Sequence, residues 1–180
     1  MADRFDTLIC LSGAVTTTAL IFLLLGGGAP VDDGRRVASL DKGLQRQITY
    51  QARTAFLEKT FEPVMTLHAK GKHQHALLKL DEIRREYPAE AHGYILKGRI
   101  LKGLGALEEA VKSYVEGVRL NGDYVDEKSP LSASTEIRQI AEEGKTVLGR
   151  KLKENPDNPT LAAVLRNVYY LESRLAGGCE

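Results

Sequence analysis

Apolar and polar residues follow three successive patterns along this chain of 180 residues. The stretch Leu8–Leu25, LICLSGAVTTTALIFLLL, contains no charged residue. Beyond residue 56, apolar residues recur at helical spacing in several segments that glycine and proline interrupt. Between these two regions, apolar residues stand at every fourth position, at Leu40, Leu44, Ile48, Ala52 and Phe56. The pattern predicts an all-α chain with one N-terminal segment that differs from the rest.

The apolar run has the length of a membrane-spanning helix. Its residues, at about 1.5 Å each, extend roughly 27 Å, close to a hydrocarbon core of about 30 Å. A cleaved signal peptide is the alternative, because Gly26–Ala29 offers a small-residue exit. The first six residues, MADRFD, lack the positive charge that such a peptide needs. The sequence therefore favours a retained single transmembrane helix within an N-terminal anchor, residues 1–28.

The Lys and Arg residues that flank the run set the expected orientation. One of them precedes the run and several follow it within about 20 residues, which places the larger part on the cytoplasmic side. We expect a single-pass protein of a bacterial inner (plasma) membrane that contacts the lipid bilayer through residues 8–25. A tethered periplasmic domain is the alternative.

Residues 29–56 are expected to connect this anchor to the remainder. The sequence GGGAPVDDG at residues 26–34 is typical of a flexible joint. Ser39 is the expected N-cap of a helix that presents the stripe of every fourth residue. Two interpretations of the stripe stay open: it packs on the segment that follows, or it joins copies of the chain as a stalk.

Small residues and prolines recur at a constant step in the C-terminal part. The step takes Gly71, Ala76 and Pro88 to Gly105, Ala110 and Gly122, and Gly122 to Pro156. A period of about 34 residues is typical of a helix–turn–helix unit that stacks on its neighbours because it cannot bury its apolar face alone.

Residues 57–156 resemble the tetratricopeptide repeat (TPR) family. The resemblance is closest over residues 91–124, where Lys97 and Gly122 are the departures, and looser over residues 57–90, where Pro63 either starts a short helix or kinks a longer one. The matching residues within 91–124 are Tyr94, Gly98, Leu101, Ala110, Tyr114 and Gly117. Those within 57–90 are Leu67, Ala76, Leu80 and Pro88.

The spacing has a physical reason. Gly98 and Ala110 are small where two antiparallel helices approach closely, while Tyr94, Leu101 and Tyr114 fill the surrounding volume. Gly105 is expected to end the first helix as its C-cap.

The third unit, residues 125–158, is predicted to be half a repeat. A loop containing Pro130 replaces its first helix, and its second helix runs from about Thr135 to Glu154, with Gly144 at the small place. A lone helix after Pro159 then ends at Gly177. The resemblance implies that residues 57–180 form a short α-solenoid of antiparallel helix pairs with a C-terminal capping helix.

Composition and motifs indicate no reaction. The 25 Lys and Arg residues nearly balance 24 Asp and Glu residues, so nucleic acid is not an expected partner. Cys10 and Cys179 are placed too differently to predict a disulfide. His73 and His75 flank Gln74 and point to different faces of a helix. We expect no catalytic residue, no cofactor and no metal site, and interpret the four histidines as surface residues.

The resemblance implies a concave groove lined by the first helix of each repeat. Such a groove, apolar at one end and basic at the other, suits an amphipathic or acidic segment. Its residues are expected to be Phe61, Met65 and His68 in the first repeat and His92, Ile95, Arg99 and Lys102 in the second.

Two functions follow as expectations. The first is a membrane-anchored TPR adaptor or scaffold that binds a partner protein and supports assembly of a membrane-associated complex. The alternative is a permanent structural accessory subunit of a larger membrane protein complex. The expected partners are proteins, either other subunits or an assembly factor of that complex, or an amphipathic or acidic segment.

Overall fold

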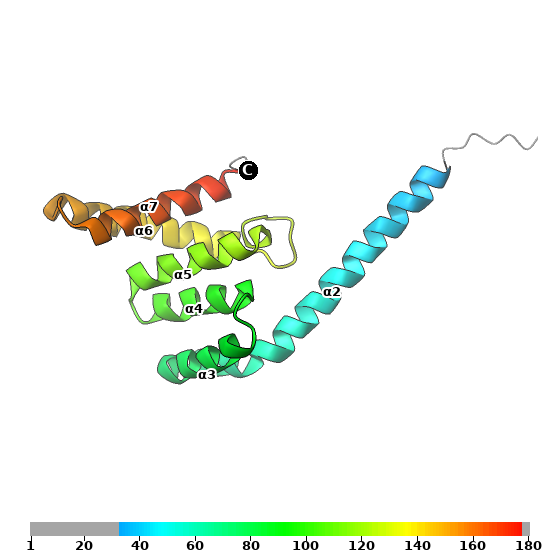
Figure 1. The fold of residues 1–180 in the computed structure, drawn as a ribbon, viewed down its shortest axis with the longest axis horizontal. Helices are drawn as coiled ribbons and strands as arrows, with labels where there is room; N and C mark the ends of the chain where they lie inside the picture. Colours follow the sequence, from blue (N-terminus) through cyan, green and yellow to red (C-terminus); the bar gives the residue numbers. More distant parts are fainter. Residues whose placement is uncertain (1–32, 178–180) are drawn as a thin grey trace, which may run out of the picture. The chain divides into compact units, whose positions relative to one another are not determined.

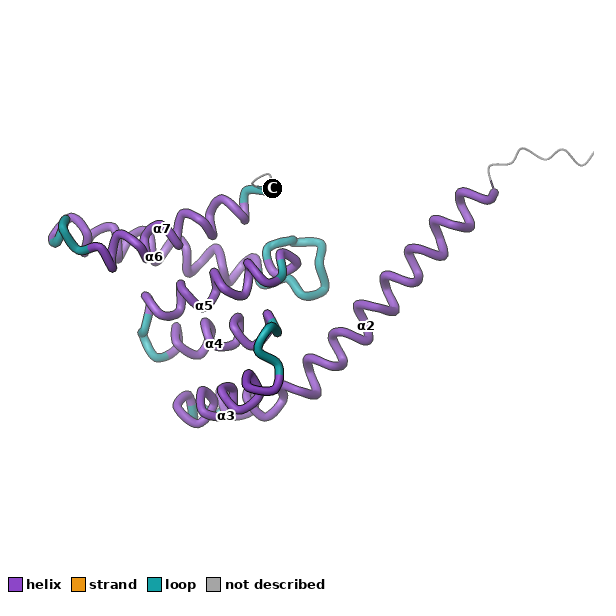
Figure 2. The backbone as a smooth tube through the Cα atoms, viewed as in Figure 1, coloured by secondary structure: helices purple, strands orange, loops and turns teal. Residues whose placement is uncertain are grey.

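The computed structural model describes residues 33–177, and the elements within that range are all helical (Figures 1 and 2). Backbone contacts group the described residues from 49 onward into one unit and those up to 48 into another. The helices are α2 (Asp33–Ala69), α3 (His73–Glu86), α4 (Ala91–Gly103), α5 (Leu107–Leu120), the short 3-10 helix η1 (Gly122–Tyr124), α6 (Ser134–Glu154) and α7 (Pro159–Leu175).

Helix α2 is longer than predicted. It contains 37 residues and runs without a break across the expected boundary between residues 56 and 57. The prediction of an N-cap at Ser39 is wrong, because that residue lies inside the helix. Pro63 also lies inside it, which matches the second of the two outcomes considered, a longer helix. Pro63 and Lys59 are both exposed, so water can reach the carbonyl that the proline leaves without a donor.

The constant step of the sequence is confirmed in the backbone. Helices α3 and α5 each contain 14 residues, and their first residues, His73 and Leu107, are separated by the same step as Gly71 and Gly105. Each helix follows a turn at a glycine with positive φ, 71° at Gly71 and 75° at Gly105. The predicted role of Gly105 just after the end of α4 is therefore confirmed.

The small places bring α4 and α5 together as predicted. A Cβ atom on Gly98 would lie 2.7 Å from the Tyr114 ring, and one on Gly117 would lie 2.6 Å from Cδ1 of Ile95. Ala110 is fully buried. The helices can approach this closely because these positions carry little or no side chain.

Two hydrophobic clusters fill the space between the helices, which Figure 1 shows stacked in chain order from α3 to α7. The first cluster joins the C-terminal part of α2 to α3 and α4 and contains Leu57, Phe61, Val64, Ala76, Leu80, Ile83, Leu96 and Ile100. The second joins α4 to α7, and its largest buried members include Tyr114, Tyr124, Ile137, Ile140, Leu148 and Leu171. Helix α4 contributes to both clusters and is the central element of this unit.

The end of the chain differs from the prediction. Helix α6 has nearly the expected bounds. The prediction made it the second helix of a half repeat, followed by a lone helix, and this assignment is wrong. Helix α6 packs antiparallel on α7, and a Cβ on Gly144 would lie 2.7 Å from Cγ2 of Val168. Lys145 of α6 also bonds Glu172 of α7 at 3.0 Å. Gly144 therefore has the same role in this hairpin that Gly98 has in the α4–α5 hairpin, and α6 and α7 form a third helix pair.

The fold prediction also needs correction in its N-terminal element. Within residues 33–177, no helix is both long and apolar enough to cross a bilayer. The longest of these helices, α2, carries charged residues along its length, among them Arg53 and Glu58. The expected span, residues 8–25, lies outside the described range. The structure therefore supports neither the predicted transmembrane helix nor the predicted single-pass membrane location.

Candidate partner-binding surface

A charged network joins α2 to the first turn of α4. Glu90 is the N-cap of α4, and its Oε1 accepts a hydrogen bond of 3.1 Å from the backbone N–H of His92. The same oxygen accepts a second bond, of 2.7 Å, from Nη2 of Arg53 on α2. Only 8% of the Glu90 side chain is exposed, so its charge depends on these two donors. The network fixes the position of this part of α2 against α4.

His92 lies behind this network, between an aromatic ring and a hydroxyl. The rings of Phe61 and His92 pack edge to face with centroids 5.1 Å apart, and Nδ1 of His92 is 3.0 Å from the Tyr124 hydroxyl. Burial, together with the charges of Arg99 and Arg53, lowers the pKa of His92 to about 4. The imidazole is therefore neutral at pH 7. It ties α4 to η1 and is not free to contact a ligand.

Arg99 and Glu136 form a two-pronged ion pair between α4 and α6. Nε of Arg99 donates to Oε2 of Glu136 at 2.9 Å, and Nη2 donates to Oε1 at 2.8 Å. The side chains are 39% and 24% exposed, so this pair is reached by solvent, unlike the Glu90 carboxylate. Two parallel hydrogen bonds between a planar guanidinium and a carboxylate form the strongest arrangement of such a pair.

This pair lies at an open cleft beside the first turn of α6. The cleft has a volume of about 660 Å³. Its wall is mostly polar, because α6 begins there after a serine-rich loop. The lining residues are Arg99, Glu127, Ser132, Ala133, Ser134, Thr135, Glu136 and Gln139.

The structure separates the predicted groove residues into two groups. Phe61 and Ile95 have no exposed surface and lie in the two hydrophobic clusters, so they do not line a groove. His92 is held by Tyr124, as described above. The resemblance implies that the repeat places of Phe61 and Ile95 face the groove. In the structure Phe61 fills the space beside His92, and Ile95 fills the space over Gly117.

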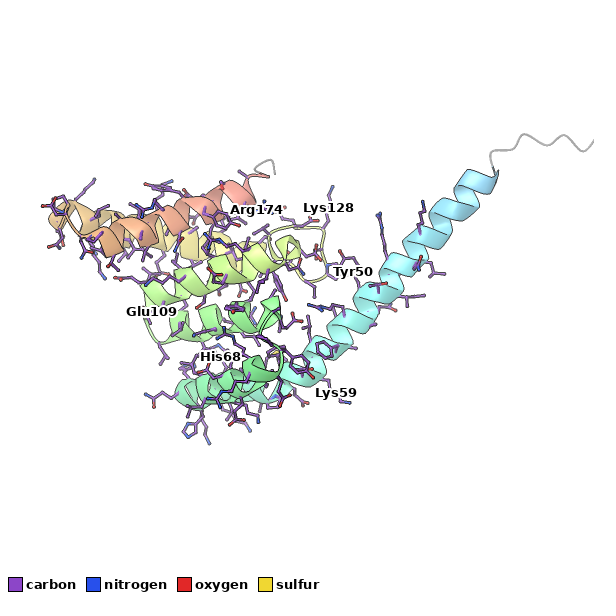
Figure 3. The ribbon with its side chains drawn as sticks, in the orientation of Figure 1. Tyr50, Lys59, His68, Glu109, Lys128 and Arg174 are labelled. Carbon is purple, nitrogen blue, oxygen red and sulfur yellow. The ribbon has the colours of Figure 1, made fainter. Side chains whose placement is uncertain are left out.

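The remaining predicted residues are partly exposed. Met65 packs at the margin of the α2–α4 cluster, His68 meets His73 across the α2–α3 turn, and Lys102 is half-buried near the end of α4. Arg99 is the one member of the predicted set that lines the cleft. Figure 3 shows the side chains on these helices and labels His68.

Sequence reasoning missed both carboxylates that organise this face. Glutamate is not a preferred N-cap, so Glu90 gave no capping signal. The predicted second helix, from about Thr135 to Glu154, includes Glu136, and only first helices are expected to line the groove. A usable signal existed, since Arg53–Glu90 and Arg99–Glu136 each join residues 37 positions apart, a little more than one repeat.

Within the part of the chain that the structure describes, no three His, Cys, Asp or Glu side chains are grouped to hold a metal ion. No protein-family model matches the sequence, and no curated protein matches it either.

Proposed function

We propose that this chain is a protein-binding scaffold of the TPR type, and that the cleft between α4 and α6 holds a segment of its partner. The observation that carries this proposal is the partly exposed Arg99–Glu136 pair at that cleft. Helical-repeat proteins bind partners through surfaces that successive first helices share. Helices α4 and α6 are the first helices of successive pairs, and the cleft lies beside the side chains that connect them.

The chemistry of Arg99 favours an acidic segment as the partner. A guanidinium binds carboxylates through two parallel hydrogen bonds, and Glu136 occupies this position in the free chain. A carboxylate of the partner would compete with Glu136 for the same donors. Exchange is feasible because solvent reaches both side chains, so water can solvate Glu136 when a partner carboxylate takes its place. Backbone groups of the partner would meet the serine and threonine hydroxyls of the cleft wall.

Site-directed photocrosslinking tests this proposal. A photoreactive residue at Gln139, which lines the cleft, is expected to capture a partner from native cells. The same residue at Lys112, an exposed position on α5 outside the cleft, is the matched control. A protein captured at Gln139 and not at Lys112 supports the proposal. Equal capture at both positions, or none at Gln139, contradicts it.

A second candidate is a fixed subunit of a larger assembly. Leu44 and Ile48, one turn apart on α2, are each 57% exposed, and a permanently bound neighbour would cover them. Purification under mild conditions separates the two functions. A partner retained at constant stoichiometry through size exclusion favours the fixed subunit, whereas a partner that a competing acidic peptide displaces favours the scaffold.

A further inference from the structure

Two histidine rings face each other at the turn between α2 and α3. His68 stands in the last turn of α2, and His73 is the first residue of α3. Their Nδ1 atoms are 2.9 Å apart and their ring centroids 4.8 Å apart. Both residues are partly buried, so solvent reaches the pair without surrounding it.

The backbone holds these rings in place. The turn between them is closed by bonds of 2.9 Å from Gly71 N–H to the His68 carbonyl and from Lys72 N–H to the Leu67 carbonyl. The end of α4 lies against both rings, since a Cβ on Gly103 would be 3.6 Å from Cε1 of each. The turn and the end of α4 therefore keep the two rings next to each other.

This distance matches that of two neighbouring ligands on one metal ion. Imidazole nitrogens bind at about 2.0–2.1 Å, which places cis ligands at right angles about 2.9 Å apart and tetrahedral ligands about 3.4 Å apart. Right angles are the geometry of square-planar and octahedral sites, which Cu²⁺ and Ni²⁺ prefer. We propose that His68 and His73 form a two-nitrogen binding site for Cu²⁺ or Ni²⁺, with both Nδ1 atoms as ligands.

The protonation state of the pair suits this role. In the free chain one Nδ1–H donates to the other Nδ1. When the metal binds, that ring carries its proton on Nε2 instead, and a rotation of both rings directs the two lone pairs toward the ion. The metal binds the two rings as neutral imidazoles.

The surroundings indicate modest affinity. The C-terminal end of α4, at Gly103, carries partial negative charge and favours a cation, whereas Arg99 opposes it. Since no group of three His, Cys, Asp or Glu side chains occurs within residues 33–177, water or a donor from another chain would complete the coordination.

The experiment uses the full chain without a histidine tag. Cu²⁺ is added at one equivalent, and the number of coupled imidazole nitrogens is read from the electron paramagnetic resonance spectrum. Two coupled nitrogens support the site. One nitrogen, or the spectrum of aqueous Cu²⁺, overturns it, and this readout needs no variant.

Calorimetric titration with Ni²⁺ identifies the ligands. His73→Gln and His68→Gln should each weaken binding by about tenfold or more, equivalent to roughly 1.4 kcal/mol. The matched control is His75→Gln, because His75 is exposed and lies two positions from His73. It should leave the affinity within about twofold of the wild type. Thermal melts in chelator establish that each variant is folded. Equal losses in His75→Gln and His73→Gln would overturn the assignment.

Discussion

Gly71 and Gly105 occupy equivalent positions in the α2–α3 and α4–α5 turns, and they close these turns with the same hydrogen bonds. The N–H of Gly71 donates to the His68 carbonyl at 2.9 Å, and that of Gly105 donates to the Lys102 carbonyl at 3.0 Å. In both turns the next residue also donates to the carbonyl five positions before it. The repetition in the sequence therefore extends to single backbone bonds, although the side chains around the two turns differ.

The equivalent turns predict equal effects of equal substitutions. Gly71→Ala and Gly105→Ala should each lower the free energy of unfolding by about 1–2 kcal/mol, because both glycines have positive φ. No atom lies within 4 Å of either Cβ position, so no clash adds to this cost. Asparagine at either position should be less costly than alanine. Urea denaturation measures these differences. Costs that differ between the two turns by more than about 1 kcal/mol would contradict the equivalence.

Substitution by alanine should change stability in opposite directions at two glycines inside helices, because only one of them lies where two helices touch. Gly98→Ala places a methyl group 2.7 Å from the Tyr114 ring and should destabilise the fold by about 1–3 kcal/mol. Gly149→Ala on α6 is the matched control, because no atom lies within 4 Å of its Cβ position. It should stabilise by roughly 0.5–1 kcal/mol through helix propensity. Thermal melts decide the signs, and a stabilising Gly98→Ala would mean that the packing is wrong.

Arg53 and Glu90 should be energetically coupled. Glu90→Ala removes the N-cap of α4, and Arg53→Ala leaves a buried carboxylate with one donor fewer, so each should destabilise by about 1–2 kcal/mol. The double variant should lose less than the sum of the two, by at least about 0.5 kcal/mol. A double-mutant cycle in urea measures this coupling energy. Strict additivity would show that the two residues do not interact in solution.

His92 predicts how stability depends on pH. Its pKa is about 4 in the folded chain and about 6.5 when unfolded, so between these values the unfolded chain binds a proton that the folded chain does not. The stability that neutral His92 contributes to the folded chain is fully present above pH 6.5. It falls as the pH falls toward 4, by about 3 kcal/mol in total. His92→Gln should flatten the dependence in this window, and exposed His75→Gln should not. Unchanged slopes in His92→Gln would assign the dependence to other groups.

The repeat geometry was predictable because its determinants are local. Gly105 and Gly98 are required by a turn and by a helix contact, and each leaves a signal in the sequence. The third helix pair was not predictable in the same way, because the loop before Ser134 breaks the constant step and α6 has 21 residues, more than the 13 of α4. Gly144 matches the small place of a second helix in the repeat pattern, whereas in the structure it lies on α6, the first helix of its pair.

The surface was less predictable than the fold. The family pattern indicates which places face a groove. It does not indicate that the Ile95 side chain packs over Gly117, where no side chain fills the space. Likewise, the pairing of Arg99 depended on a carboxylate from a helix whose register the sequence did not determine. Long-range contacts of this kind leave no local pattern.

In the proposed scaffold, Arg99 binds a carboxylate of the partner in place of Glu136. The most direct test is the affinity of a peptide, synthesised from the partner segment crosslinked at Gln139, for three full-length proteins: the wild type and two variants. Glu136→Gln frees the Arg99 donors and should tighten binding severalfold, while Arg99→Gln should weaken it severalfold, and added salt should shrink both differences. Fluorescence anisotropy measures the three dissociation constants. Equal affinities for all three proteins, or weaker binding to Glu136→Gln, would contradict the account.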